Sequence, residues 1–166
     1  MSGVSRIRAV AIDVDGVLTD GTFWWGPDGQ EWKRFSFRDV MGVSLALRSG
    51  LIIAMISGEE SPLVDRFATK MGIEDVFKGC KDKARALREL ARRRGLELSE
   101  IAYMGDDVND LEAMKLSGLA ATPADAEDSV RARAQFVSKH EGGRGAVREL
   151  LEHLIERSGE SRDKKS

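Results

Sequence analysis

Short apolar runs alternate along the chain with stretches of helical periodicity. The runs are three to six residues long and end at polar or glycine residues, and they cover 8–12, 51–56, 101–104 and 119–121. Runs this short suit buried strands, because a buried helix usually needs about ten residues or more. The four runs therefore predict strands at the centre of the fold.

Two stretches between the runs repeat their apolar residues at helical spacing. The positions that share a face are Val40, Val43 and Leu47 in the first stretch, and Ala84, Leu87, Leu90 and Ala91 in the second. Charged residues fill the opposite faces, as in helices that pack on a sheet. This alternation predicts an α/β fold, a Rossmann-like parallel sheet with helices on both faces.

Residues 22–37 depart from the alternation. Thr22–Trp25 and Gln30–Phe37 flank a Gly-Pro-Asp-Gly turn, a pattern that predicts a small β-hairpin flap. The segment holds all three tryptophans of the chain. Because an isolated hairpin cannot bury aromatic side chains on both faces, it packs either on its own domain or on another subunit. The other connections are too short for a separate cap domain.

Length and composition restrict the rest. A chain of 166 residues suits a single domain, which we expect over residues 1–157, with a disordered polar tail at 158–166. The net charge of −2 gives no reason to expect a nucleic-acid partner. Cys80 is the only cysteine, so neither an internal disulfide nor a cysteine-based zinc cluster can form. No apolar stretch resembles a membrane span or a signal peptide, so we expect a cytoplasmic protein with no membrane partner.

Polar clusters directly follow three of the apolar runs, at Asp13-Val14-Asp15-Gly16, Ser57-Gly58-Glu59 and Gly105-Asp106-Asp107. Because the carboxyl ends of parallel strands meet at one edge of the sheet, the three clusters should converge there. Asp13 and Asp15 point the same way from an extended backbone and repel each other, and Asp106 adds a third carboxylate. Each Asp alone also suits a helix cap or a turn, but three clusters at one edge favour a magnesium site.

Ser57, Gly58 and Lys83 suit phosphate binding. Ser57 offers a hydroxyl, and Gly58 lets the backbone approach a ligand closely. Lys83 stands in the first turn of the second predicted helix, where the helix dipole favours an anion. A bound phosphate or the Asp13 carboxylate would offset that conflict. The alternative for Lys83 is an ordinary solvated lysine.

The order Asp-x-Asp, Ser, Lys, Gly-Asp-Asp over residues 13–110 resembles the haloacid dehalogenase superfamily of phosphohydrolases. Residues 35–39, 105–110 and 142–149 resemble its capless branch, which includes the 3-deoxy-D-manno-octulosonate 8-phosphate phosphatases. The resemblance implies a magnesium-dependent phosphomonoesterase that forms an aspartyl-phosphate. It also implies a sugar-phosphate substrate and a homotetramer joined through the 22–37 hairpins.

The same resemblance assigns roles to residues. Asp13 would attack phosphorus, while Asp15 would protonate the leaving oxygen and then activate water. The residues implied to hold Mg²⁺ are Asp13, Asp15 through its backbone carbonyl and Asp106, with Asp107 and Asp110 as supporting acids. Those implied to bind the phosphoryl group are Ser57, Gly58 and Lys83.

Two departures from the octulosonate pattern leave the substrate open. Val40 stands where a glycine is usual, and Glu59 stands where an arginine is usual. Related nonulosonate 9-phosphate phosphatases resemble this chain at Gly58-Glu59, and Lys70 can pair with Glu59 from the next helix, although Glu59 also suits a helix N-terminus. We expect octulosonate 8-phosphate as the substrate, with 2-keto-3-deoxy-nonulosonate or N-acylneuraminate 9-phosphate as the alternative. Glu59 and Lys70 are then candidate specificity residues.

Two other classes of protein compete with a phosphatase. Related domains occur fused to sialate cytidylyltransferases as non-catalytic oligomerisation modules, in which catalytic positions are lost. All of those positions are present here, namely Asp13, Asp15, Ser57, Lys83 and Asp106. Phosphoacceptor receiver domains pair adjacent acids after the first strand, whereas Val14 separates the two acids of this chain. The sequence therefore favours an enzyme.

Overall fold

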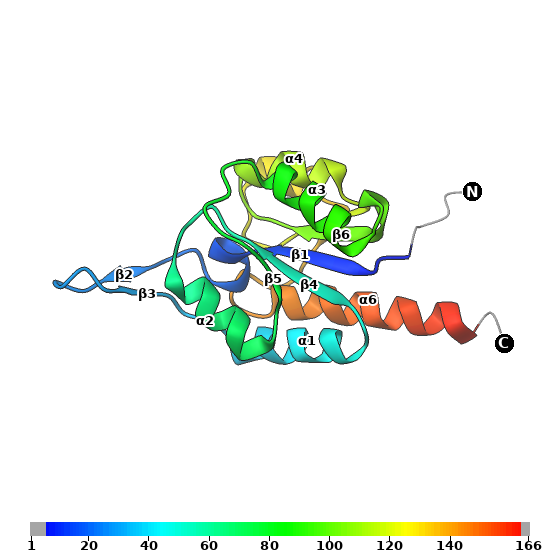
Figure 1. The fold of residues 1–166 in the computed structure, drawn as a ribbon, viewed down its shortest axis with the longest axis horizontal. Coiled ribbons are helices and arrows are strands. Elements are labelled where there is room, and N and C mark those ends of the chain that lie inside the picture. Colours follow the sequence, from blue (N-terminus) through cyan, green and yellow to red (C-terminus); the bar gives the residue numbers. More distant parts are fainter. Residues whose placement is uncertain (1–5, 164–166) are drawn as a thin grey trace.

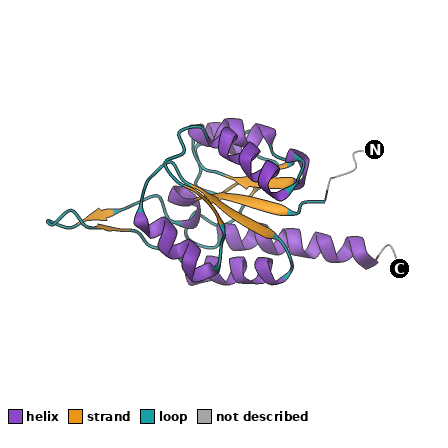
Figure 2. Ribbon diagram, viewed as in Figure 1, coloured by secondary structure: helices purple, strands orange, loops and turns teal. Residues whose placement is uncertain are grey.

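A six-stranded sheet forms the centre of the computed structural model, which describes residues 6–163 (Figures 1 and 2). Its strands, in spatial order, are β5 (Asp75–Phe77), β4 (Ile52–Ile56), β1 (Ala9–Asp13), β6 (Ile101–Met104), β7 (Leu119–Thr122) and β8 (Phe136–Val137). Each neighbouring pair is parallel. The predicted α/β class is confirmed, and each of the four apolar runs forms a strand.

Helices cover both faces of this sheet (Figure 1). They are α1 (Phe37–Arg48), α2 (Pro62–Met71), α3 (Lys83–Arg94), α4 (Leu111–Leu116), α5 (Asp128–Arg131) and α6 (Ala146–Asp163). One core joins α1, α2 and α6 to Val10 and Ile12 of β1, and the other joins α3, α4 and α5 to Ala9 and Ala11. The alternation of side chains along β1 therefore divides this strand between two apolar cores.

An antiparallel hairpin of β2 (Trp24–Trp25) and β3 (Glu31–Trp32) projects from the sheet (Figure 1). The flap is shorter than predicted, because Phe37 is the first residue of α1 and not part of the hairpin. Ser36 caps this helix by accepting a hydrogen bond from the Arg38 N–H.

Four aromatic side chains near the tip of the hairpin are exposed, with fractions of 52% for Phe23, 54% for Trp24, 70% for Trp25 and 49% for Trp32. Phe35, in contrast, packs on the core of its own domain, with its ring stacked on Phe67 at 4.8 Å. The structure therefore contradicts burial within the monomer for Phe23 and the three tryptophans, but not for Phe35.

The end of the chain also differs from the prediction. Residues 158–163, expected in a disordered tail, continue α6, because each residue added to an anchored helix gains a backbone hydrogen bond. Residues 164–166 of that predicted tail lie outside the described residues. Among residues 6–163, no helix combines the length and apolarity that crossing a membrane requires.

Candidate active site

The polar clusters meet at the carboxyl ends of the central strands, where the order in which strands are added to the sheet reverses. After β1, the chain builds β4 and β5 on one side and then returns to build β6 to β8 on the other. Ligands of open α/β sheets bind at the carboxyl ends of strands beside such a switch point. Carboxylate oxygens of Asp13, Asp106 and Asp110 lie within 4.8 Å of one another at this edge.

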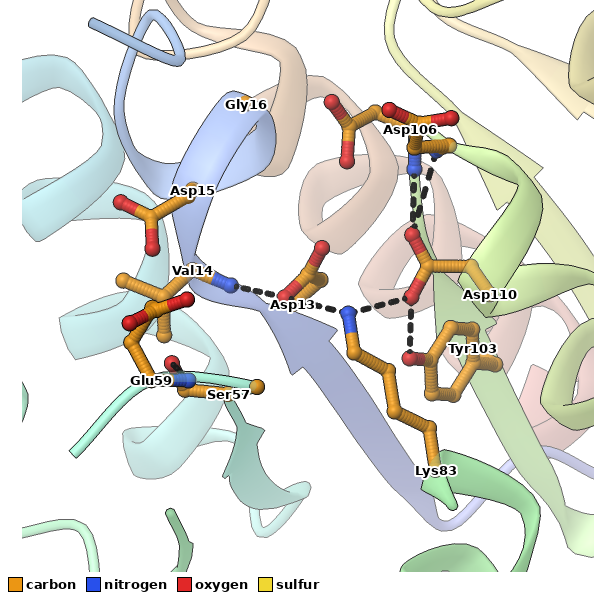
Figure 3. Close-up of polar contacts among 12 residues, drawn as sticks. Asp13, Val14, Asp15, Gly16, Ser57, Glu59, Lys83, Tyr103, Asp106 and Asp110 are labelled. Atoms are coloured by element: carbon orange, nitrogen blue, oxygen red, sulfur yellow. Dashed lines mark hydrogen bonds and ion pairs between the residues drawn. The ribbon is translucent and has the colours of Figure 1, made fainter. Parts of the chain in front are cut away.

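Asp13 ends β1 and is buried, with an exposed fraction of 5%. Its Oδ1 accepts a hydrogen bond from the Val14 N–H at 2.8 Å and lies 3.0 Å from Lys83 Nζ (Figure 3). Burial and repulsion from Asp110 raise the pKa of Asp13 well above its ordinary value, and Lys83 opposes this rise. Further positive charge beside Asp13 would therefore stabilise its ionised form.

Lys83 is a buried bridge between two carboxylates and not a solvated lysine. Its Nζ lies 3.0 Å from Asp13 Oδ1 and 2.9 Å from Asp110 Oδ1. Burial lowers the pKa of Lys83, but the two carboxylates outweigh burial and the net shift is upward. Lys83 therefore keeps its charge, and these anions offset the unfavourable helix dipole at the start of α3.

Asp110 is fully buried, and hydrogen-bond donors contact both of its oxygens. Oδ1 accepts from Lys83 Nζ at 2.9 Å and from the Tyr103 hydroxyl at 2.6 Å. Oδ2 accepts from the backbone N–H of Asp106 at 2.9 Å and of Asp107 at 3.2 Å. Because a carboxylate has about four acceptor positions, Asp110 has little capacity left for a metal. Its geometry instead orients Lys83 and the loop after β6.

Asp106 lies next to Gly16, in the loop that follows β1. Burial and repulsion from Asp110 raise the pKa of Asp106 to about 7. A Cβ atom on Gly16 would lie 1.9 Å from Asp106 Oδ2, and the φ of Gly16 is 86°, so this close approach requires glycine. Asp107 is exposed and accepts a hydrogen bond from the Val108 N–H at 2.7 Å, so it caps the turn that follows.

The donor set fits a hard divalent cation. Burial and repulsion from Asp110 raise the pKa values of the neighbouring carboxyl groups of Asp13 and Asp106, and a cation bound to both would favour their ionised forms. Oxygen-only ligands of this kind suit Mg²⁺. Hydrogen-bond donors already contact both oxygens of Asp110. The side chains that would bind the ion are therefore those of Asp13 and Asp106. The backbone carbonyl of Asp15 stays a predicted third ligand.

A lysine that the sequence analysis missed contacts Asp15. Lys33 Nζ lies 2.8 Å from Asp15 Oδ1 and 3.0 Å from Oδ2, and 3.6 Å from Glu31 Oε1. In the sequence, Lys33 is one of several charged residues in the hairpin segment. No local pattern identifies it, because only the path of the hairpin brings it to Asp15. Tyr103 was missed for another reason, since an aromatic residue inside a strand is typical of the core.

The cluster after β4 forms a compact turn. Ser57 is buried, and its Oγ accepts a hydrogen bond from the Glu59 N–H at 3.1 Å across Gly58. Ser57 and Glu59 lie on the Asp15 side of the site (Figure 3). Glu59 is exposed, and it does not form the ion pair with Lys70 that the sequence allowed between these two described residues. Lys70 instead lies 5.8 Å from the centroid of the Phe37 ring.

The loop after β1 is supported by a glycine-rich segment near the end of the chain. The Gly143 N–H donates to the Val17 carbonyl at 2.9 Å. A Cβ atom on Gly142 would lie 1.9 Å from the Gly16 carbonyl oxygen, so the two backbones touch. Buried Asp39 accepts hydrogen bonds from the backbone N–H of Gly145 at 3.4 Å and of Arg148 at 3.2 Å.

Known proteins are similar in sequence to this chain over most of its length. The haloacid dehalogenase-like hydrolase family matches residues 51–150. The 3-deoxy-D-manno-octulosonate 8-phosphate phosphatase KdsC of Escherichia coli strain B is 37% identical over 155 residues, which cover 93% of this chain and 82% of that relative. The chain belongs to the haloacid dehalogenase-like hydrolases.

Solved haloacid dehalogenase-like structures share its fold. The 3-deoxy-D-manno-octulosonate 8-phosphate phosphatase of Moraxella catarrhalis, in complex with magnesium, phosphate and KDO, has a TM-score of 0.89 at 37% identity, covering 92% of this chain and 88% of that one. The cobalt-bound Haemophilus influenzae phosphatase has a TM-score of 0.90 at 34% identity, covering 93% and 90%. The family resemblance predicted from the sequence is confirmed.

Proposed function

We propose that this chain is a magnesium-dependent phosphatase that hydrolyses 3-deoxy-D-manno-octulosonate 8-phosphate through an aspartyl-phosphate. The observation that carries the proposal is the buried Asp13 carboxylate, held by Lys83 and facing Asp106 at the switch point. The E. coli relative is a phosphatase of this sugar phosphate, and the M. catarrhalis relative holds magnesium, phosphate and KDO.

Asp13 and Asp15 have different roles in the reaction. An oxygen of Asp13 attacks phosphorus and forms a new P–O bond as the bond to the sugar oxygen breaks, while Asp15 gives its proton to that oxygen. Asp15 then takes a proton from water as the water oxygen attacks the phosphoaspartate. This second step releases inorganic phosphate and restores the Asp13 carboxylate.

The phosphoryl oxygens bind to Lys83, Ser57 and the backbone at Gly58. Lys83 is ordered in advance by Asp13 and Asp110, so little reorganisation is needed when the substrate arrives. When bound by Asp13 and Asp106, Mg²⁺ supplies positive charge that neutralises the phosphoryl oxygens and the repulsion within the acidic cluster.

A nonulosonate 9-phosphate is the second candidate substrate, and Glu59 favours it. Glu59 is exposed beside Ser57. Lys70 and Phe37 line a cavity of about 300 Å³ that also includes Lys33, the partner of Asp15. We therefore propose Glu59 and Lys70 as residues that recognise the sugar acid.

The exposed hairpin aromatics support assembly. We propose that the 22–37 hairpins of neighbouring subunits pack together in a homotetramer, because burying these rings removes a large apolar area from water. The cytoplasm is the proposed location, and the single phosphatase domain over residues 1–157 stays a prediction.

Turnover of a substrate panel tests the function. Octulosonate 8-phosphate should give the highest kcat/KM, above nonulosonate 9-phosphates and p-nitrophenyl phosphate, and magnesium should be required. Asp13→Asn should abolish turnover with an unchanged circular dichroism spectrum, because an amide cannot replace the nucleophile. Substantial turnover by a contaminant-free Asp13→Asn protein would contradict the aspartyl-phosphate route. Inactivity of the wild type on every compound would favour the non-catalytic module.

A further inference from the structure

A lysine of the hairpin segment forms an ion pair with Asp15 in the loop after β1. The Lys33 ammonium contacts both carboxylate oxygens of Asp15, at 2.8 and 3.0 Å. Glu31, which belongs to β3, lies 3.6 Å from the same ammonium. Contacts to both oxygens restrict the rotation of the Asp15 carboxylate as well as its position.

This ion pair differs from an ordinary surface pair in the burial of its lysine. The Lys33 side chain is 3% exposed, whereas Lys78 in its pair with Asp65 is 26% exposed. The Asp15 side chain is 35% exposed, so the pair is partly buried. Surface pairs contribute little to stability, and a buried pair must offset the loss of hydration of its charges. Ordering a lysine side chain also costs conformational entropy. Stability alone is therefore a weak reason for this contact.

Asp15 has no second anchor of this kind. In the described part of the chain, Lys33 is the only side chain that contacts its carboxylate. Asp13, in contrast, is held by both the Val14 N–H and Lys83. The Asp15 carboxylate also points away from Asp106 (Figure 3), so the acidic cluster does not orient it.

We infer that Lys33 is a positioning residue that sets the orientation of Asp15 for proton transfer. The inference rests on the proposed function, in which Asp15 is the acid and the base. Proton transfer requires its partners within hydrogen-bond reach, and a displacement of about 1 Å can cost about 10²-fold in rate. The hairpin thus contributes to the chemistry of its own chain, independently of any assembly.

Kinetics of Lys33→Met, Lys33→Arg and Asp15→Asn, with the Lys33→Met/Asp15→Asn double variant, test this role. Lys33→Met should lower kcat on octulosonate 8-phosphate about 10- to 100-fold with little change in KM. The loss should be smaller on p-nitrophenyl phosphate, whose leaving group needs no proton. Lys33→Arg should recover most of the activity. Lys115→Met, which removes an exposed lysine of α4, controls for net charge and should match the wild type.

The double variant separates positioning from an independent role. Lys33→Met should cause no further loss in the Asp15→Asn background, because the side chain that it positions is already disabled. The inference would be overturned if the activity losses of the two single variants multiplied in the double variant. It would also be overturned if Lys33→Met raised KM and left kcat unchanged. Either result would show that Lys33 binds substrate. If Lys33→Met fails to fold, a folded Lys33→Arg protein that has lost activity equally on both substrates overturns it too. Normal turnover by Asp15→Asn would contradict the proposed function, whereas normal turnover by Lys33→Met beside an impaired Asp15→Asn would overturn the inference alone.

Discussion

Asp106→Asn is expected to stabilise the metal-free protein at pH 8 and to weaken its response to Mg²⁺. Burial and repulsion from Asp110 raise the pKa of Asp106 from an ordinary value of 3.8 to about 7. The folded state therefore binds this proton more tightly than the unfolded chain does. As the pH rises from about 4 to about 7, the contribution of Asp106 to the free energy of unfolding falls, and it stays low above pH 7.

The pKa difference limits the size of the effect. One pKa unit corresponds to about 1.4 kcal/mol, so the shift to about 7 gives an upper limit of about 4 kcal/mol. Asparagine also loses the attraction between Asp106 and Lys83, which reduces the gain. We expect a net stabilisation of about 1–2 kcal/mol at pH 8, or about 2–8 °C in Tm for a chain of this size. At pH 5 the wild-type carboxyl is already protonated, so the gain should nearly vanish.

Thermal denaturation at pH 5 and pH 8, with a chelator or with Mg²⁺, measures the effect. The wild type should gain stability from Mg²⁺ at pH 8, and Asp106→Asn should gain less because a ligand is missing. Asp107→Asn is the matched control, since Asp107 is the exposed neighbour that caps a turn. This control should keep the full response to Mg²⁺.

Two outcomes would refute this reasoning. The first is a lower Tm of metal-free Asp106→Asn than of the wild type at pH 8. The second is a wild-type stability in chelator that does not fall between pH 5 and pH 7. Either result would mean that the acidic cluster is not under repulsion and has no need of a cation.

Two further substitutions test other contacts. Tyr103→Phe removes the hydroxyl that donates to Asp110 and should lower the free energy of unfolding by about 1–3 kcal/mol in urea denaturation; an unchanged value would show that this contact adds nothing. Replacing Trp24, Trp25 and Trp32 together with Ser should give a smaller species in light scattering with a folded sheet domain, because each ring buried at an interface contributes roughly 1.5–3 kcal/mol. A triple variant of wild-type mass would contradict assembly through the hairpin.

The central fold could be predicted because each strand carries its own apolar signal. β1 and β4 are continuous apolar runs, as strands covered on both faces should be. β8 has only two residues, Phe136–Val137, which is too few for a pattern, and it forms because the sheet offers an edge at β7. The expected hairpin ran on to Phe37 because the Ser36 cap is recognisable only once the helix start is known.

The candidate site was predictable wherever a residue lies at the carboxyl end of its strand or within two residues after it. Asp13, Ser57 and Asp106 met this condition, and the parallel topology brought them to one edge. Lys33 did not, because its position depends on how the chain returns from the hairpin turn. The position of Lys83 in the first turn of a helix did not decide between a phosphate-binding and a solvated lysine. The structure excludes a solvated lysine, because Lys83 is buried between two carboxylates.

The contact between the glycine-rich segment 142–145 and the loop after β1 has a consequence for synthesis. The ribosome synthesises the Asp13 motif before this segment. Until the segment emerges, the Val17 carbonyl lacks the Gly143 N–H, and Asp39 lacks the backbone groups of Gly145 and Arg148. A nascent chain without this segment therefore lacks the contacts that support the loop after β1 and Asp39. A fragment that ends before Gly142 is expected to show no phosphatase activity.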